Sequence, residues 1–230
     1  MSEYDAAACL TRYFEIVRER PERFENPKGD IYEILLDPER IAHAQSEARR
    51  VRVRDGMPSD DLRVGVLAED PYLLVVRDAV KFADGTYGLY NRLMVPSGAA
   101  ILPVHDGRIV LLDRFRHGTR AWHLEIPRGS FSGEGTHEDE ARRELQEEIG
   151  AGVVEMIDLG LLHSTTGCLD EMHHLYMARV DAIGVPDKHE AIVALRPFTV
   201  DETAARIADG TITDGPTLAA FLRARLRGYL

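Results

Sequence analysis

The chain has 230 residues, of which 44% are hydrophobic and 29% are charged, and its formal net charge is −11. This length and composition suit a globular protein that buries a true core, as one sizeable domain or as a domain with a smaller addition. The negative charge argues against a protein that wraps the polyanionic backbone of nucleic acid, although an anionic small molecule could bind through a bridging metal ion.

Cysteine content and hydropathy indicate the cellular compartment in which the protein is expected. Only Cys9 and Cys168 are present, which is too few for a disulfide scaffold and lacks the spacing of zinc ligands. No apolar run approaches the roughly 20 residues that a membrane helix needs, and the first residues carry acids in place of the apolar core of a signal peptide. We therefore expect a cytoplasmic protein with no membrane partner.

The first sixty residues predict a helical arm. Apolar residues at helical spacing over residues 5–20 predict an amphipathic helix that ends before Pro21. After a turn-rich linker, residues 37–50 predict a second helix. The basic run EARRVRVR (47–54) favours a solvated helix end that passes into a strand over a nucleic-acid surface, because the rest of the chain is acidic. We expect the arm to cover residues 1–62.

From residue 63 the pattern changes to short apolar and β-branched runs separated by Gly and Asp-Gly turn signals, which predict strands. One strong helix interrupts them at GTHEDEARRELQEEIG (135–150), and two helices are expected at about 200–209 and 215–227. Strands with helices around them and no regular β–α–β alternation indicate an α+β fold with a mixed-sheet sandwich. This domain is expected to span residues 63–230.

The strong helix has a clear start and a clear buried face. Thr136 is a good N-cap, and Asp139 three residues later gives a start like a capping box. Ala141, Leu145 and Ile149 recur every four residues, so this stripe is expected to face the core.

Three carboxylates lie beside that stripe. Glu144, Glu147 and Glu148 sit just before Gly150, near the helix C-terminus, where the helix dipole disfavours negative charge. Arg143 is placed to hold Glu147, which leaves Glu144 and Glu148 as an unpaired couple. Nearby carboxylates either take up a proton or share a cation, and oxygen ligands suit Mg²⁺ or Mn²⁺ together with phosphate oxygens. A plain solvated face is the alternative, but the arginine, the core stripe and the glycine stop favour a functional site.

The residues around these acids match a known signature. Gly129 followed by RELQEEIGA (143–151) resembles the signature of the Nudix hydrolases, G-x5-E-x7-R-E-U-x-E-E-x-G-U, where U is aliphatic. The second half matches, with Ala151 as a small version of the last position. In the first half Gly135 stands where the signature has glutamate, and Glu134 lies one residue early. The match fixes many positions at set offsets, so it is specific.

Flanking segments narrow the resemblance to the ADP-ribose pyrophosphatases. RFRHGTRAWHLEIPRG (114–129) and HSTTGCLDEMHHLYMARV (163–180) are similar to the segments before and after the Nudix helix of those enzymes, although the turn at 164–167 lacks their proline. The resemblance covers about residues 63–227. It implies a Nudix-type mixed-sheet α/β/α sandwich, and it leaves the helical N-terminal extension unexplained. It also suggests a homodimer in which strands of residues 63–97 or the arm provide contacts.

The resemblance also implies an activity and a metal site. The expected reaction is hydrolysis of the pyrophosphate bond of ADP-ribose or a related nucleoside diphosphate sugar, which gives a nucleoside monophosphate and a sugar phosphate. Glu144 and Glu148 would hold Mg²⁺, with Mn²⁺ as the alternative ion, and Glu147 would be a further ligand. Arg143 would orient the acids, and Arg128 would lie at the substrate with its backbone carbonyl near the metal.

Other residues are expected at the substrate. Glu171 is the candidate general base or water-orienting residue, and an exposed acid at a strand start is the alternative. Arg116 and Glu125 are candidates for binding phosphate and the terminal sugar, although an arginine on a strand could equally pair with a surface acid. Trp122 could stack on a base, but packing in the core or an interface is the favoured interpretation.

The histidines do not predict a metal site. His173 and His174 are adjacent, so on a strand they would point to opposite faces and make a poor pair of ligands. We interpret them as structural or surface residues.

Two other functions stay open. One is a Nudix hydrolase that acts on another nucleoside diphosphate or triphosphate. The other is a Nudix-fold module that senses a nucleotide without cleaving it. The intact Arg143, Glu144, Glu147 and Glu148 argue against the second, since a sensing module is expected to lose them.

Overall fold

The computed structural model describes residues 5–131, 133–185 and 189–230. The chain divides into two compact units, which we call the N-terminal unit (residues 1–95 and 165–170) and the C-terminal unit (residues 96–164 and 171–230). The strands that follow residue 62 contact the two N-terminal helices. The separate domain expected from residue 63 onward stays a prediction.

The C-terminal unit is built on one mixed sheet. Its elements are β5 (Gly98–His105), β6 (Arg108–Arg116), β7 (Ala121–Glu125), β8 (Arg128–Ser130), α3 (His137–Ile149), β9 (Val153–Leu162), β11 (His173–Val180), β12 (Ile192–Phe198), α4 (Val200–Ala208) and α5 (Gly215–Leu226). The sheet runs β12-β6-β5-β11-β9, with β7 paired to β6 and β8 paired to β5. Strands β5 and β11 are parallel, and the other described pairs of this sheet are antiparallel.

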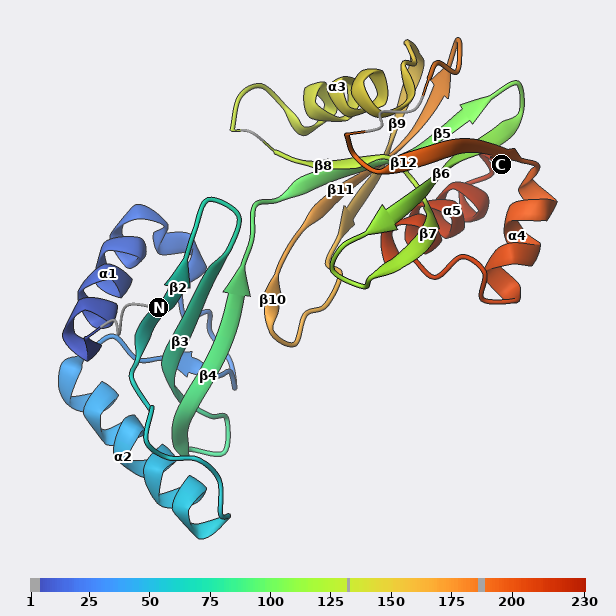
Figure 1. The fold of residues 1–230 in the computed structure, drawn as a ribbon. Helices are drawn as coiled ribbons and strands as arrows, with labels where there is room; N and C mark the ends of the chain where they lie inside the picture. Colours follow the sequence, from blue (N-terminus) through green and yellow to red (C-terminus); the bar gives the residue numbers. More distant parts are fainter. Residues whose placement is uncertain (1–4, 132, 186–188) are drawn as a thin grey trace. The chain divides into compact units, whose positions relative to one another are not determined.

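Helices cover both faces of this sheet (Figure 1). Successive residues of a strand point to opposite faces, and β5 follows this rule with apolar residues throughout. Ala99 and Ile101 pack in one buried cluster with Leu145 of α3. Ala100 and Leu102 pack in a second cluster with residues of α5. The predicted α+β fold with an α/β/α sandwich is therefore confirmed.

Helix α3 begins and ends as its sequence predicts. The Thr136 hydroxyl accepts a hydrogen bond from the Asp139 backbone N–H, and the Asp139 carboxylate accepts one from the Thr136 N–H, which completes the capping box. Gly150 ends the helix in the left-handed region with φ 62°, a conformation that glycine adopts without strain. Ala141 and Ile149 are fully buried with Leu145 between them, so the predicted core stripe is confirmed.

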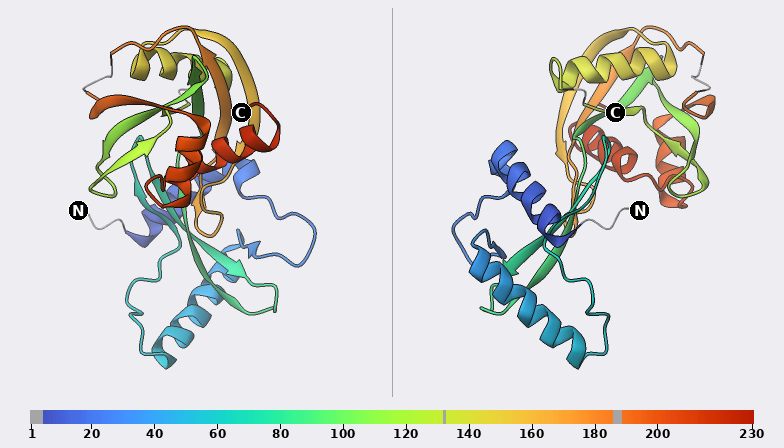
Figure 2. Two further views of the ribbon diagram at one scale, coloured as in Figure 1. Left: turned by 90° about the vertical axis from the view of Figure 1, so that its right-hand side faces the viewer. Right: turned by 60° about the vertical axis from the view of Figure 1, so that its left-hand side comes forward.

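The N-terminal unit packs two helices on a second sheet. Its elements are α1 (Ala6–Glu19), the short 3₁₀ helix η1 (Pro21–Arg23), β1 (Glu33–Ile34), α2 (Pro38–Arg54), β2 (Gly65–Glu69), β3 (Leu74–Lys81), β4 (Tyr87–Met94) and β10 (Leu169–Asp170). The sheet runs β1-β3-β4-β10, and β2 pairs with β3. Figure 2 shows this sheet and its helices from two further directions. The predicted helical N-terminal extension is confirmed.

The basic run after residue 46 differs from its prediction. Helix α2 continues to Arg54, and the Asp55 backbone N–H donates to the Val51 carbonyl at 3.0 Å. A turn follows, and the chain reaches a strand only at Gly65. The predicted passage from helix to strand inside the run was wrong, because the alternating valines and arginines also fit the last turn of a helix.

A buried polar network anchors α1 to the sheet of its own unit. The Asp78 carboxylate is 1% exposed, accepts a hydrogen bond from the Tyr13 hydroxyl at 2.5 Å, and pairs with Arg92 at 2.6 Å. The Arg92 guanidinium also lies over the Phe24 ring, 4.9 Å from its centroid. The buried charge is thus balanced by an opposite charge and a hydrogen bond.

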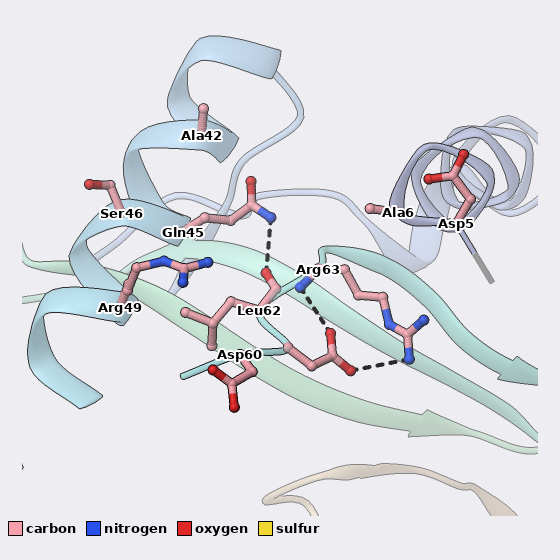
Figure 3. Close-up of a pocket in the computed structure, with 10 residues that line it drawn as sticks. Asp5, Ala6, Ala42, Gln45, Ser46, Arg49, Asp60, Leu62 and Arg63 are labelled. Carbon is pink, nitrogen blue, oxygen red and sulfur yellow. Dashed lines mark hydrogen bonds and ion pairs between the residues drawn. The ribbon is translucent and has the colours of Figure 1, made fainter. Parts of the chain in front are cut away.

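The N-terminal unit also contains a polar cavity of about 930 Å³ between α2 and the segment that leads into β2 (Figure 3). Gln45 of α2 donates to the Leu62 carbonyl at 2.9 Å on its wall, and Arg49 and Asp60 line it. None of the residues expected at the catalytic site lines this cavity. Among the described helices, none combines the length and the apolar character that crossing a membrane requires.

Candidate active site

The carboxylates of α3 are divided between the interior and the surface. Glu144 and Glu148 are buried, with 8% and 3% exposure, whereas the Glu147 side chain is 53% exposed. Residues three or four apart share a helix face. Glu148 lies three residues after the buried Leu145, and Glu144 lies three residues after the buried Ala141, so packing this stripe on the sheet also draws both acids inward. The two expected metal ligands therefore lie at the sheet, and the third lies at the surface.

Strand β8 runs along these carboxylates, beneath α3 in Figure 1. The Arg128 backbone N–H donates to Glu148 Oε2 at 3.2 Å. A Cβ atom added to Gly129 would lie 2.1 Å from Glu144 Cδ, a distance that real Cβ atoms essentially never show. Position 129 must therefore be glycine for the Glu144 carboxylate to lie where it does.

Burial raises the pKa of the Glu144 and Glu148 carboxyls. Desolvation is the main cause that raises the pKa of Glu148 to about 7, against the opposing effect of the Arg114 charge. Desolvation likewise raises the pKa of Glu144 to about 7, and the neighbouring Glu148 charge adds to the rise. Two carboxylates held in this way would gain from a shared cation.

Arg143 contacts more acids than expected. Its Nη1 donates to Glu147 at 2.5 Å, which confirms the predicted pair. Its Nη2 donates to Glu144 at 2.7 Å and also contacts the buried Glu140. The prediction that Glu144 is unpaired was wrong, because Nη2 lies within reach of both of these acids.

Arg114 was missed by the sequence analysis. Its side chain is 7% exposed, and its Nη1 donates to Glu148 Oε1 at 2.5 Å while its Nη2 contacts Glu190. The prediction that Glu148 is unpaired was therefore also wrong. The available signal was the Arg-Phe-Arg spacing, which places Arg114 and Arg116 on the same face of β6.

Arg116, Glu125 and Arg128 lie together. Glu125 is 1% exposed and accepts a hydrogen bond from Arg116 Nε at 3.0 Å. Arg128 Nη1 donates to Asp214, the N-cap of α5, at 2.6 Å, and its Nη2 lies 3.7 Å from Glu125. The structure thus pairs Arg116 with Glu125, a buried acid and not the surface acid considered from the sequence.

Glu171 lies between β10 and β11, two residues before β11 begins. Its Oε1 is 3.3 Å from His173 Nε2, and hydrogen bonds to His173 and to Ser164 lower the pKa of Glu171 to about 2. The carboxylate is therefore ionised at neutral pH. His173 was expected to be structural or surface, and its contact with the candidate base was not foreseen.

Two sequence features differ from expectation. The Trp122 side chain is 55% exposed and meets only the edge of Phe115 among the described ring contacts, at 5.5 Å between centroids, so the core interpretation was wrong. Gly135 adopts φ 73°, a conformation that strains other residues, so a glutamate there would require a different loop. Glu134, one residue earlier, is exposed.

The donor set fits a hard divalent ion. Within residues 5–131, 133–185 and 189–230, no three Asp, Glu, His or Cys side chains gather as a metal cluster. The reason is visible in the ion pairs, because Arg143 holds Glu147 at the surface and Arg114 holds Glu148. Glu144 and Glu148 still offer partly desolvated oxygens, and the absence of a side chain at Gly129 lets the Glu144 carboxylate lie against β8.

Comparison with known proteins agrees with this arrangement. The model of the NUDIX domain family matches residues 94–221, which is more than half of the chain. The chain belongs to the Nudix family. GDP-mannose pyrophosphatase of Yersinia enterocolitica serotype O:8 / biotype 1B (strain NCTC 13174 / 8081) is 32% identical over 58% of this chain and 76% of its own. ADP-ribose pyrophosphatase of Bacillus subtilis (strain 168) is 25% identical over 59% of this chain and 75% of its own.

Two other proteins are similar to this chain. Methanol dehydrogenase activator of Bacillus methanolicus is 27% identical over 62% of this chain and 80% of its own. A crystal structure of an ADP compounds hydrolase superposes with a TM-score of 0.64 and 18% identity, and covers 74% of this chain and 95% of that one, which supports the fold. With this family and these pyrophosphatase relatives, the protein is a hydrolase.

Proposed function

We propose that the protein is an Mg²⁺-dependent Nudix pyrophosphohydrolase that cleaves ADP-ribose or a related nucleoside diphosphate sugar into a nucleoside monophosphate and a sugar phosphate. The observation that carries the proposal is the buried pair Glu144 and Glu148, set against Gly129 in a chain whose relatives include two such pyrophosphatases. Nudix hydrolases generally use divalent cations, and carboxylate oxygens suit Mg²⁺ or Mn²⁺.

Glu144 and Glu148 would hold the ion, with Glu147 as a further ligand once Arg143 releases it. A bound divalent ion would neutralise charge on the diphosphate and lower the pKa of a bound water. Arg143 keeps the acids in place through its contacts with Glu140, Glu144 and Glu147.

Glu171 is proposed to orient the attacking water. A general base works best when its pKa is near the working pH, and the hydrogen bonds to His173 and Ser164 keep the pKa of Glu171 far below that. The ionised Oε atoms can accept a hydrogen bond from water, so positioning is the role that this environment favours.

The arginines beside the carboxylates are proposed to bind the diphosphate. Arg116 and Arg128 both lie within 4 Å of the buried Glu125, which fixes their guanidinium groups before substrate arrives. Preorganised guanidinium groups recognise phosphate oxygens through paired N–H donors. Glu125 then acts by holding the arginines, in addition to its proposed contact with the sugar.

The assembly and location are proposed from the resemblance. We expect a homodimer that uses the N-terminal arm or the strands of residues 63–97, a cytoplasmic location and no nucleic-acid partner. A light-scattering mass equal to one chain would rule out the dimer.

Turnover of a substrate panel tests the proposed reaction. ADP-ribose, other nucleoside diphosphate sugars, dinucleotides and nucleoside triphosphates are incubated with Mg²⁺, and the products are separated chromatographically. Cleavage of a diphosphate sugar into a nucleoside monophosphate and a sugar phosphate is expected. Preferred turnover of a triphosphate would support the other hydrolase function, and no turnover of any compound would support a sensing module.

Glu148→Gln is expected to abolish metal-dependent turnover while the protein stays folded. Glu155→Gln is a matched control, because Glu155 also pairs with an arginine, Arg179, but on the exposed part of β9. Retained activity in the Glu148 variant would remove the metal site from the proposal.

A further inference from the structure

Arg114 is paired with Glu148, a carboxylate that the proposed reaction needs as a metal ligand. Its Nη1 donates to Glu148 Oε1 at 2.5 Å, and its side chain is 7% exposed. Arginine stays protonated under all ordinary conditions, so a full positive charge is held permanently beside this buried oxygen. A divalent ion that binds Glu148 through this oxygen must displace the guanidinium.

The same guanidinium has a second acidic partner. Its Nη2 contacts Glu190, whose side chain is 44% exposed, and its Nη1 lies 3.9 Å from Glu125. Arg114 can therefore lose Glu148 and still be paired with Glu190. Without Glu190, a displaced guanidinium would have only the longer 3.9 Å contact with Glu125 to balance its buried charge, which makes displacement by a metal less favourable.

We propose that Arg114 competes with the divalent ion for Glu148: its guanidinium neutralises Glu148 in the metal-free protein, and it gives up this contact but keeps its contact with Glu190 when the ion binds. This inference rests on the proposed metal site at Glu144 and Glu148. It assigns to Arg114 the control of metal affinity, and to Glu190 a positioning role that acts through Arg114.

Binding of Mn²⁺ to the full-length protein tests the inference without an activity assay. Free Mn²⁺ is counted by electron paramagnetic resonance at pH 8.5, where protons compete little for the carboxylates. Arg114→Gln is expected to bind Mn²⁺ about tenfold more tightly than the unaltered protein, since a neighbouring opposite charge is typically worth one pKa unit or more to a carboxylate. Arg196→Gln is the matched control, because the exposed Arg196 of β12 pairs with the half-buried Asp113, which precedes Arg114 on β6, and its loss should change nothing.

Glu190→Gln separates this mechanism from a general effect of charge. In the unaltered background it should weaken Mn²⁺ binding, because the displaced guanidinium loses its second partner. In the Arg114→Gln background it should have no effect, because no guanidinium remains to be displaced. Equal weakening in both backgrounds would show that Glu190 acts only through its charge and would overturn its role.

Further outcomes decide the remaining points. Arg114→Gln leaves Glu148 without its arginine, which could prevent folding, so circular dichroism checks the fold of each variant used in a titration. If Arg114→Gln does not fold, Arg114→Lys is measured in its place. Lysine keeps the charge as a single ammonium that cannot contact Glu148 and Glu190 as a planar fork, so it should bind Mn²⁺ with intermediate affinity. Unchanged affinity in the folded Arg114 variant would overturn the inference. Absence of Mn²⁺ binding in the unaltered protein would instead overturn the proposed metal site.

Discussion

At the scale of single residues, the site depends on acids whose burial is costly. Glu144 and Glu148 are drawn inward by the same helical periodicity that buries Leu145, and desolvation raises the pKa of both carboxyls to about 7. Arg143 and Arg114 offset part of the cost by direct contacts. A metal-free protein therefore carries an unfavourable electrostatic energy that a divalent ion can relieve.

The pH dependence of stability without metal follows from these two groups. Each has a folded-state pKa above its ordinary value of 4.5, so the folded protein binds more protons than the unfolded chain between about pH 4.5 and 7. The protonated carboxyls therefore make their whole stabilising contribution to the free energy of unfolding below pH 4.5, and this contribution is lost as the pH rises through 7. Melting temperatures in EDTA should therefore fall over this window relative to a Glu144→Gln/Glu148→Gln variant.

Added Mg²⁺ supplies the complementary measurement. At pH 8 both carboxyls are ionised, so Mg²⁺ should raise the melting temperature of the unaltered protein more than at pH 5. The double variant should show no such difference. If the melting temperatures of the two proteins in EDTA changed with pH in the same way, the assignment of the raised pKa values would be contradicted.

Glu171 gives a second prediction at this scale. Glu171→Gln should lower kcat by about one hundredfold, the size of effect that misplacing a reacting group can have, and leave Mn²⁺ affinity unchanged. Because hydrogen bonds lower the pKa of Glu171 to about 2, its ionisation should not produce a limb in the pH–rate profile near neutrality. An unaltered kcat would remove it from the mechanism.

At the scale of elements, the site depends on the close approach of β8 to α3. The space that would hold a side chain at position 129 is filled by the Glu144 carboxylate. Gly129→Ala forces the carboxylate or the strand to move, which should cost about 1–3 kcal/mol of stability as overpacking does, and should weaken Mn²⁺ binding.

A glycine elsewhere provides the control for this substitution. A Cβ at Gly118 meets nothing within 4 Å, and its backbone lies outside the left-handed region, so Gly118→Ala should leave both properties unchanged. Thermal melts and Mn²⁺ titrations of the two variants make the comparison. Normal Mn²⁺ binding by Gly129→Ala would show that Glu144 does not need this position.

The elements themselves could be predicted because their signals are local. The capping box at Thr136, the core stripe around Leu145 and the Gly150 stop are read within one segment of chain, and the structure contains all three. The partners of the acids could not be read in this way. Arg114 lies 34 residues from Glu148, and only the pairing of distant strands and the packing of α3 bring them together.

At the scale of the whole molecule, the two units have separate cores. Each described cluster of buried apolar residues draws its members from one unit, with Leu145 in a cluster of the C-terminal unit and Tyr13 in one of the N-terminal unit. The N-terminal unit has in addition the buried pair of Asp78 and Arg92, to which the Tyr13 hydroxyl is hydrogen-bonded. Units with their own cores can unfold in separate steps.

Two substitutions, one in each unit, should therefore lower different unfolding transitions, which calorimetry can separate. Asp78→Ala leaves the partly buried Arg92 guanidinium without its carboxylate partner and should lower one transition by an amount equivalent to at most about 3–5 kcal/mol. Leu145→Ala leaves a cavity under α3 and should lower the other by about 2–5 kcal/mol. The double variant should show both shifts at their single-variant sizes, since the two side chains belong to separate apolar cores. A single transition that both substitutions lower together would mean that the chain unfolds as one cooperative body.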